Sequence, residues 1–196
     1  KEFWNQRYDQ HSTVYGFEPN AYFKSKLDLH IPSSLLLPAE GEGRNALYAA
    51  GVGWEVDAFD FSLVAQKKAL SLADEKRLSI HYFIEDITHF IPIKQYGAIG
   101  LLYVHLHESI RKAFHQKIIN ALLPSGVLIL EAFSKGQLHN TSGGPKSIDQ
   151  LYSIDELTAD FSELHILEAV ETTVDLNEGP FHKGRANVVR VYARKN

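Results

Sequence analysis

The sequence predicts an α/β fold in which helices cover both faces of a parallel sheet. Short apolar runs rich in β-branched residues recur along the chain, and longer segments with helical spacing separate them. Residues that cap or break helices stand at the boundaries of those longer segments. Continuous apolar runs are typical of strands buried on both faces, and their alternation with helices is typical of a doubly wound, Rossmann-like sheet.

The central part of the chain supplies most of the predicted elements. We expect strands at residues 34–38, 54–59, 79–84, 98–104 and 126–133, and helices at residues 45–50, 63–76 and 110–123. Ser62 precedes the second of these helices, where its hydroxyl can accept a hydrogen bond from a free backbone N–H. Pro124 and Gly126 end the third helix and turn the chain into the next strand.

The two ends of the chain differ from its central part. Two helices, at residues 3–10 and 20–30, form a predicted helical cover within residues 1–30. The polar stretch 134–153 is long for a loop in a compact domain, and loops of that length are often functional, so we expect a lid there. The remaining expected elements of a single domain over residues 1–196 are a helix at 154–161 and two closing strands at 165–174 and 186–193, joined by a turn at 177–185.

Composition narrows the classes of function. The chain has a formal net charge of −4, which gives no global attraction to nucleic acid or to an anionic membrane. The absence of cysteine excludes disulfides, cysteine-ligated zinc and thiol nucleophiles. The sequence has no apolar run long enough for a transmembrane helix, and residues 1–10 do not resemble a signal peptide. We therefore expect a cytoplasmic monomer or homodimer that acts on a small molecule and binds neither membrane, nucleic acid nor metal.

A glycine-rich loop follows the first predicted strand. Its sequence, Gly41-Glu42-Gly43-Arg44-Asn45-Ala46, matches the G-x-G-x-x-A pattern of nucleotide-binding turns between a strand and a helix. Glycine is needed in such a turn because a Cβ would block the close approach of a ligand to the backbone. The pattern alone also fits a tight turn without a ligand.

Acidic residues stand at the carboxyl ends of the next two predicted strands. Asp60 lies 19 residues after Gly41, a position from which a carboxylate can accept hydrogen bonds from both ribose hydroxyls. Glu85 and Asp86 follow the third strand, where an acidic side chain can accept a hydrogen bond from an adenine amino group. Alone, Asp60 also fits a helix cap and Asp86 a solvated turn. Together with the loop, these residues predict a ligand that contains ribose.

The charges of the loop favour one ligand class. Glu40 and Glu42 flank Gly41, and carboxylates fit badly against the pyrophosphate of a dinucleotide. They fit better near a sulfonium or an ammonium group, which favours S-adenosylmethionine over NAD. Two alternatives stay open: an NAD(P)-dependent oxidoreductase on a Rossmann fold, and a non-catalytic cofactor-binding protein on the same fold.

Further segments extend this pattern over essentially the whole chain. They are Phe3-Trp4-Asn5-Gln6-Arg7-Tyr8, Tyr15-Gly16-Phe17-Glu18-Pro19-Asn20, Ala58-Phe59-Asp60-Phe61-Ser62, Asp86 and Leu123-Pro124-Ser125-Gly126, together with the glycine loop. With these segments the sequence resembles the class I S-adenosylmethionine-dependent methyltransferases. Within that family it resembles the group of the tellurite-resistance methyltransferase, with thiopurine methyltransferases as more distant kin.

The resemblance implies a seven-stranded sheet with an antiparallel last strand, and S-adenosyl-L-methionine as the cofactor. Asp60 would bind the ribose, and Asp86 would lie near the adenine. Phe61 and Ile87 would sandwich the adenine, and Arg7 would pair with the cofactor carboxylate. The full set of implied cofactor contacts is Trp4, Arg7, Tyr15, Gly16, Glu40, Gly41, Gly43, Asn45, Asp60, Phe61, Ser62, Asp86, Ile87 and Tyr103.

The loop departs from the family pattern at its start. Family members usually have an acidic residue at the place of Leu37, and Gly-Cys-Gly at the place of Ala39-Glu40-Gly41. The loss of the acid puts the usual contact with the cofactor's amino group in doubt. Glu40 is its expected replacement.

Methyl transfer requires oriented reactants and exclusion of water, and only some acceptors require a base. Tyr103 and His105 alternate onto one side of the fourth predicted strand, so both are expected to face the methyl group, with His105 as a candidate base. His182 and Arg185 precede the last strand, where they could bind an oxyanion or orient a nucleophile. Packed or solvent-exposed roles fit these four residues too. The resemblance suggests a chalcogen oxyanion or a thiol as acceptor.

Overall fold

A mixed sheet of seven strands organises the chain. The structure is a computed structural model that describes residues 2–9 and 13–196. The strands are β1 (Ser34–Pro38), β2 (Glu55–Asp60), β3 (His81–Ile84), β4 (Tyr96–Leu102), β5 (Leu122–Phe133), β6 (His165–Asn177) and β7 (Lys183–Arg194). They lie in the order β3-β2-β1-β4-β5-β7-β6, and β7 runs antiparallel to both of its neighbours. The predicted fold class, including the antiparallel last strand, is confirmed.

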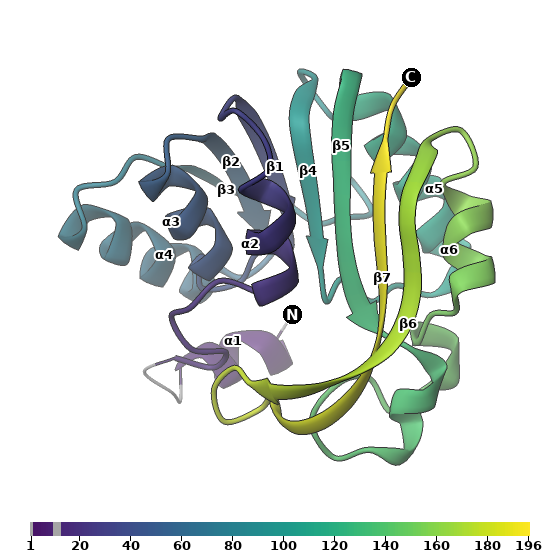
Figure 1. The fold of residues 1–196 in the computed structure, drawn as a ribbon. Coiled ribbons are helices and arrows are strands. Elements are labelled where there is room, and N and C mark those ends of the chain that lie inside the picture. Colours follow the sequence, from purple (N-terminus) through teal and green to yellow (C-terminus); the bar gives the residue numbers. More distant parts are fainter. Residues whose placement is uncertain (1, 10–12) are drawn as a thin grey trace.

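Helices cover both faces of this sheet (Figure 1). The helices are α1 (Glu2–Asp9), α2 (Ala21–Leu27), α3 (Arg44–Gly51), α4 (Leu63–Glu75), α5 (Glu108–Ala121) and α6 (Ile154–Asp160), with short 3-10 helices at Lys135–His139 and Ile148–Gln150. Helices α2, α3 and α4 pack on one face through one hydrophobic cluster, and α5 and α6 pack on the other through a second. The predicted end of the first helix at Gln10 lies outside the described residues.

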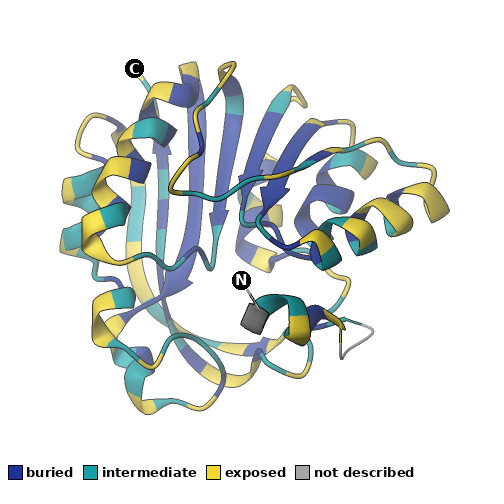
Figure 2. Cartoon of the chain, turned by 180° about the vertical axis from the view of Figure 1, so that it is seen from behind, coloured by how far each residue is buried: buried dark blue, intermediate teal, exposed yellow. Residues whose placement is uncertain are grey.

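The sheet is buried between these helices (Figure 2). In β1, Leu35 and Leu37 join the cluster beneath α2 and α3, whereas Leu36 joins the opposite cluster. The alternation follows from the pleat of a strand, and burial on both faces explains why the run is apolar throughout. The strand therefore holds the glycine loop that follows it on a rigid support.

Two strand boundaries differ from the predicted ones, and the second of them affects the site. Strand β5 begins at Leu122, directly after α5, and not at Gly126 as predicted. Strand β4 ends at Leu102, and Tyr103 has φ 56°, a left-handed conformation that is uncommon for a tyrosine. The regular alternation of side chains along β4 therefore stops before Tyr103.

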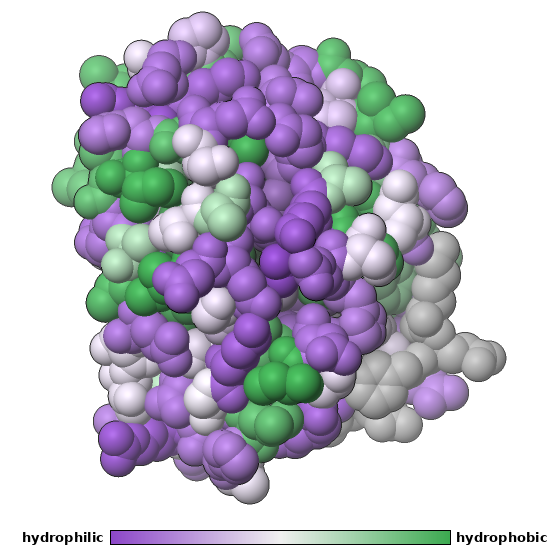
Figure 3. Space-filling model, turned by 90° about the vertical axis from the view of Figure 1, so that its right-hand side faces the viewer, coloured by the Kyte–Doolittle hydropathy of each residue, from purple (hydrophilic) through white to green (hydrophobic). Residues whose placement is uncertain are grey.

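The face formed by β6 and α6 is mostly hydrophilic, with small separate hydrophobic patches (Figure 3). Strand β6 is the last strand of the sheet, and most of its side chains are exposed or half-buried. Charged side chains along such an edge oppose pairing with another strand. Among the described residues, no helix is long and apolar enough to cross a membrane.

Candidate functional site

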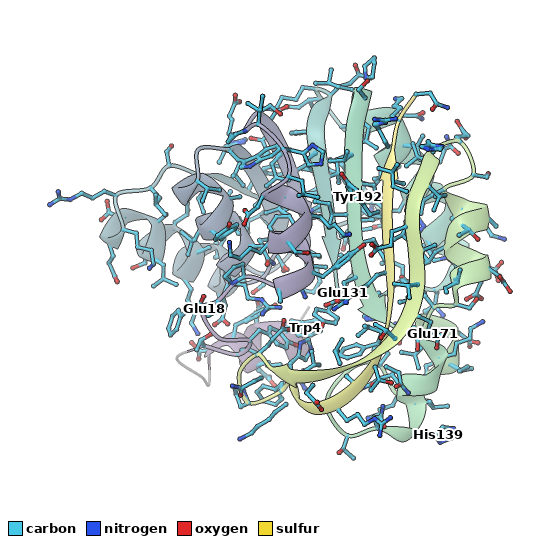
Figure 4. The ribbon with its side chains drawn as sticks, viewed as in Figure 1. Trp4, Glu18, Glu131, His139, Glu171 and Tyr192 are labelled. Carbon is cyan, nitrogen blue, oxygen red and sulfur yellow. The ribbon has the colours of Figure 1, made fainter. Side chains whose placement is uncertain are left out.

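The carboxyl ends of β1 to β4 meet at one edge of the sheet, and two segments cover this edge. Helix α1 and residues 13–20 lie across it from one side, and the β6–β7 hairpin curls beneath it from the other (Figure 1). Figure 4 shows Trp4 of α1 and Glu131 of β5 at this same end of the molecule. In doubly wound sheets the crevice outside the carboxyl ends of the strands is where ligands bind.

The two glycines of the loop are required for different structural reasons. Gly43 has φ 86° at the start of α3, and a Cβ there would lie 2.7 Å from the Cβ of Ala69 in α4. Gly43 therefore permits close packing of two helices. A Cβ at Gly41 would instead lie 2.7 Å from the Tyr8 hydroxyl. Gly41 is thus the glycine at which another group approaches the loop backbone, and Tyr8 of α1 was missed by the sequence analysis.

Glu40 and Leu37 both face into the protein. Glu40 accepts hydrogen bonds from the backbone amides of Asn45 and Ala46, at 2.7 and 2.8 Å, and from Asn45 Nδ2 at 3.1 Å. Burial raises the pKa of the Glu40 carboxyl to about 7, against the effect of these hydrogen bonds. Leu37 is 1% exposed in the core. Glu40 therefore caps α3, and this geometry argues against the expected contact with a cofactor amino group.

Asn45 links the loop to the N-terminal segment. Its Oδ1 atom accepts a hydrogen bond from the amide of Asn20 at 2.8 Å, while its Nδ2 is bound to Glu40. Both polar atoms of this buried side chain are thus engaged within the protein. Its geometry supports a role in holding the loop in place.

Asp60 lies at the end of β2, directly against the glycine loop. Its Oδ2 accepts the amide of Gly41 at 3.2 Å, and its Oδ1 accepts the amide of Ser62 at 2.9 Å. Each carboxylate oxygen can accept more than one hydrogen bond, so both retain capacity for a hydroxyl. Burial raises the pKa of the Asp60 carboxyl, against the effect of the amides that it binds.

Ser62 performs the capping role predicted for it. Its hydroxyl accepts the amide of Ala65 at 3.2 Å in the first turn of α4 and donates to Asn5 Oδ1 at 2.6 Å. The serine therefore fastens α1 to the start of α4. Its hydroxyl is engaged by two partners in this arrangement.

The residues expected around adenine lie beside Asp60. Strands β2 and β3 are paired so that Asp60 is opposite Ile84, which places Glu85 and Asp86 just beyond this pair. Asp86 Oδ1 accepts hydrogen bonds from the amide and the hydroxyl of Thr88, at 3.0 and 2.7 Å. Phe61 and Ile87 are half-buried on the same edge. The structure thus brings these predicted residues to one place.

The N-terminal cover carries the predicted residues Trp4, Arg7, Tyr15 and Gly16. The Arg7 guanidinium lies between the rings of Trp4 and Phe181, 5.2 and 4.5 Å from their centroids. Gly16 has φ 73°, and its carbonyl accepts the Thr13 hydroxyl at 3.1 Å. The contact between Arg7 and Phe181 joins the cover to the β6–β7 hairpin, so the two segments form one layer.

Tyr103 binds the buried carboxylate of Glu131, a residue that the sequence analysis missed. Its hydroxyl donates to Glu131 Oε1 at 3.0 Å, and its amide donates to the Glu131 carbonyl at 2.7 Å. Asn20 Nδ2 and Arg190 Nε donate to the two carboxylate oxygens of Glu131, each at 2.6 Å. The signal was present in the sequence, because Glu131 interrupts the apolar run of β5 and a charge there must be paired.

His105 does not face the crevice with Tyr103 as predicted. The left-handed turn at Tyr103 ends the strand alternation, and the His105 ring packs on Phe133 and Tyr152. Its Nδ1 lies 2.8 Å from the Gln150 carbonyl, and its Nε2 accepts the amide of Phe133 at 3.3 Å. Burial lowers the pKa of His105 to about 4. With both nitrogens engaged, this geometry does not support a role as a base.

The last two predicted residues differ in burial. His182 is 6% exposed and packs against Tyr15 and Tyr103, whose ring centroids lie 4.4 and 4.6 Å away. Arg185 is exposed, and its carbonyl accepts a hydrogen bond from the Ser142 hydroxyl at 2.6 Å. The structure therefore brings His182, but not the Arg185 side chain, to Tyr103.

The predicted lid stretch at residues 134–153 is folded onto β7. Gln137 donates to the Ser142 hydroxyl at 2.9 Å and accepts the amide of Asn187 at 2.8 Å. Ser134 and Tyr152, at its two ends, are joined by a β-bridge. This stretch therefore forms a compact wall beside the hairpin.

A separate groove of about 330 Å³ lies on the outer side of the glycine loop. Residues from the cover, α3 and α4 line it, among them Phe17, Glu42 and Lys68. Asp60, Asp86 and Tyr103 are not among the described residues that line this groove. The polar groups at the carboxyl edge, where doubly wound sheets bind their ligands, define the candidate site in place of this groove.

Comparison with known proteins shows which solved structures share this fold. Searches against protein-family models and against curated proteins find no match. The structure is similar to TehB from Haemophilus influenzae, with a TM-score of 0.77 and 16% identity over 100% of this chain and 66% of that one. The chain thus spans just under two thirds of TehB.

Two further solved structures share the arrangement. The structure from a study titled "Conversion of a Disulfide Bond into a Thioacetal Group during Echinomycin Biosynthesis" has a TM-score of 0.78 and 16% identity, over 94% of this chain and 84% of that one. The N-methyltransferase NodS from Bradyrhizobium japonicum, in complex with S-adenosyl-L-homocysteine, has a TM-score of 0.73 and 12% identity, over 99% and 97%. The chain has the fold of class I methyltransferases.

Proposed function

We propose that the protein is an S-adenosylmethionine-dependent methyltransferase that acts on a small molecule. The observation that carries this proposal is the position of Asp60. Its buried carboxylate, at the end of β2, binds the amide of Gly41 and retains capacity to accept ribose hydroxyls. The fold alone would not suffice, because one fold hosts many functions.

The described residues fit the adenosine half of this cofactor. Gly41 leaves the loop backbone open to a close neighbour, and that neighbour is the Tyr8 hydroxyl. Phe61 and Ile87 offer apolar surface beside Asp60 and Asp86. The amino-acid half would lie toward Tyr103 and the cover, with Arg7 near its carboxylate. We expect neither Leu37 nor Glu40 to supply its amino-group contact, because both side chains face into the protein.

Bound S-adenosylmethionine would supply an activated methyl group on a sulfonium. The protein would orient the acceptor and exclude water. The cover and the β6–β7 hairpin meet over the carboxyl edge, where Gly179 lies so close to Val14 that a Cβ would be 2.6 Å from its carbonyl. Such a closed layer holds two reactants together and removes solvent from them.

Calorimetric titration with S-adenosylhomocysteine and with NADH decides between the cofactor classes. We expect S-adenosylhomocysteine to bind and NADH not to bind. In Asp60→Asn the affinity for S-adenosylhomocysteine should fall by at least about tenfold, since hydrogen bonds to a charged group are lost. Binding of NADH alone would favour the oxidoreductase.

Transfer of a labelled methyl group decides between an enzyme and a non-catalytic binding protein. We suggest 2-mercaptoethanol, thiophenol, selenite and tellurite as acceptor probes, because TehB is similar in fold and the resemblance in sequence points to thiols or chalcogen oxyanions. Labelled product from any probe supports the enzyme. Binding without transfer to any acceptor in a wider screen would favour the binding protein.

A further inference from the structure

The turn of the β6–β7 hairpin holds a carboxylate–imidazole pair. His182 Nδ1 lies 3.3 Å from Glu178 Oε2. The backbone amide of Glu178 donates a hydrogen bond to the His182 carbonyl at 2.8 Å, which closes the turn. Arg44 of α3 donates to the same carboxylate oxygen at 3.0 Å. An ionised carboxylate only accepts hydrogen bonds, so the neutral imidazole carries its proton on Nδ1. This tautomer leaves the Nε2 lone pair as an acceptor.

Aromatic rings hold this imidazole in one orientation. The ring centroids of Tyr15, Tyr103 and Phe133 lie 4.4, 4.6 and 5.2 Å from that of His182. Burial lowers the pKa of His182, while the hydrogen bond and charge of Glu178 act in the opposite direction. Burial also opposes ionisation of Glu178, but the His182 hydrogen bond and the Arg44 charge outweigh it and lower the Glu178 pKa. An ionised carboxylate thus orients a neutral imidazole.

The pair lies where the acceptor is expected. Tyr103, which contacts the imidazole, directly follows β4 at the carboxyl edge of the sheet. A Cβ at Gly143 would lie 2.8 Å from His182 Cδ2 and 3.3 Å from Nε2, so the lid stretch packs closely against this side of the ring, which only a glycine permits. Gly179 of the same turn touches the cover, where a Cβ would lie 2.8 Å from the Gly16 amide nitrogen. The cover, the lid stretch and the end of β4 therefore converge on this ring.

We propose that Glu178 positions His182 as the general base of the acceptor site, and that the acceptor is a small neutral molecule with a thiol or hydroxyl group. This inference rests on the proposed methyl transfer. An oxyanion such as tellurite is already ionised and needs no base. An oriented, neutral imidazole with an available lone pair suits an acceptor that must lose a proton.

The His182 Nε2 lone pair takes the proton of the acceptor S–H or O–H, and the freed electron pair forms the bond to the methyl carbon. The bond between methyl and sulfur breaks with its electrons staying on sulfur, which leaves S-adenosylhomocysteine. The imidazolium then returns its proton to solvent. The step needs no oxidant or reductant.

The charges around the imidazole set the direction of the pH dependence. Glu178 from its own turn and Glu131 from β5 raise the His182 pKa, and Arg44 from α3 lowers it. The hydroxyls of Tyr15 and Tyr103 and the ring of His105 are the other titratable groups nearby. Loss of the Glu178 charge should therefore lower the His182 pKa and shift the rise of kcat/KM to lower pH.

Nitrogen chemical shifts of the His182 ring, assigned with His182→Gln, test the pairing without any turnover. Above its pKa, we expect Nδ1 to be protonated and Nε2 to be unprotonated. In Glu178→Gln the pKa should fall or the tautomer should change. Glu171→Gln, a matched change at an exposed site on β6, should do neither. A wild-type ring with its proton on Nε2 would overturn the proposal.

Kinetics with probes of different acidity test the base and the substrate class. For 2-mercaptoethanol, which is mostly un-ionised at pH 8, His182→Gln should lower kcat/KM by about 10²- to 10⁴-fold. For thiophenol, which is ionised at that pH, the loss should be far smaller. His165→Gln, an exposed matched change, should leave both rates unchanged. Equal losses with both thiols would overturn the role of the base.

Binding separates failure of this inference from failure of the proposed function. We expect His182→Gln to keep its affinity for S-adenosylhomocysteine. A wild-type protein that does not bind S-adenosylhomocysteine contradicts the proposed function. A protein that binds it and methylates tellurite but neither thiol contradicts only the substrate class proposed here.

Discussion

The carboxylate of Glu42, inside the glycine loop, accepts a hydrogen bond of 2.7 Å from the backbone amide of Val14. Val14 is fully buried, and Lys68 of α4 donates to the other carboxylate oxygen of Glu42 at 3.0 Å. The same loop that would meet the cofactor thus fastens the N-terminal cover. Binding of the cofactor and closure of the cover are therefore expected to depend on each other.

Glu42→Ala should loosen the cover while the sheet stays folded. The Val14 amide loses a bond to a charged acceptor, which is worth about 1.5–3 kcal/mol, so its hydrogen exchange should accelerate by roughly tenfold or more. Hydrogen exchange resolved by NMR measures this rate. Glu18→Ala, a change at an exposed carboxylate of the same segment, is the control and should leave the rate unchanged. An unaltered Val14 rate in Glu42→Ala would show that other contacts hold the cover.

Glu40→Ala should lower the free energy of unfolding, because the buried amides of Asn45 and Ala46 lose their acceptor. The expected loss at pH 7 is about 1–3 kcal/mol. Because burial raises the folded-state pKa of Glu40 from 4.5 to about 7, the folded protein binds the extra proton between those values. The difference in free energy of unfolding between wild type and Glu40→Ala should therefore be largest below pH 4.5 and decline as the pH rises through 7. Urea unfolding of both proteins across this range checks the trend, and a wild-type advantage that grows with pH would contradict it.

His105→Gln should change stability and not the pH dependence of turnover. Burial lowers the folded-state pKa of His105 from 6.5 to about 4. The contribution of the neutral imidazole to the free energy of unfolding is therefore present above pH 6.5 and is lost as the pH falls through 4. The difference in free energy of unfolding between wild type and variant should shrink by about 3 kcal/mol across that window. Denaturant titrations measure this difference. A shifted pH profile of kcat/KM in this variant would instead return His105 to the list of candidate bases.

Glu131→Gln should destabilise the protein, because one side chain holds Asn20, Tyr103 and Arg190. The exchange weakens its hydrogen bond from Arg190 and turns one acceptor into a donor, at a cost of about 1.5–3 kcal/mol. Thermal and urea unfolding measure the loss. Glu163→Gln, at an exposed site, should be neutral within experimental error. Equal stability of both variants would remove Glu131 from the supports of the carboxyl edge.

The sheet could be predicted from sequence because its signals are local. The run of β1 is apolar at positions that face both layers, and its predicted bounds agree with the structure. Asp60 could be placed at the edge because it follows a strand. Ser62 could be identified as a cap because that role depends on residues within one turn.

The parts that were missed depend on local conformations that the sequence does not specify and on contacts between distant segments. The side-by-side placement of Tyr103 and His105 failed because a single left-handed residue ended the strand, and no sequence rule places a tyrosine in that conformation. Glu40 faces inward because its carboxylate caps the start of α3. The sequence analysis used its charge to place it at the ligand and did not consider this local role. The pairing of Glu178 with Arg44 joins residues 134 positions apart, which one sequence does not reveal.

The position of the ribose in a crystal structure of the complex with S-adenosylhomocysteine tests the central claim most directly. We expect both ribose hydroxyls within hydrogen-bonding distance of the Asp60 carboxylate, with adenine between Phe61 and Ile87 and Tyr8 displaced from Gly41. Ligand density in the outer groove beside Phe17 and Lys68, with Asp60 unchanged, would contradict it.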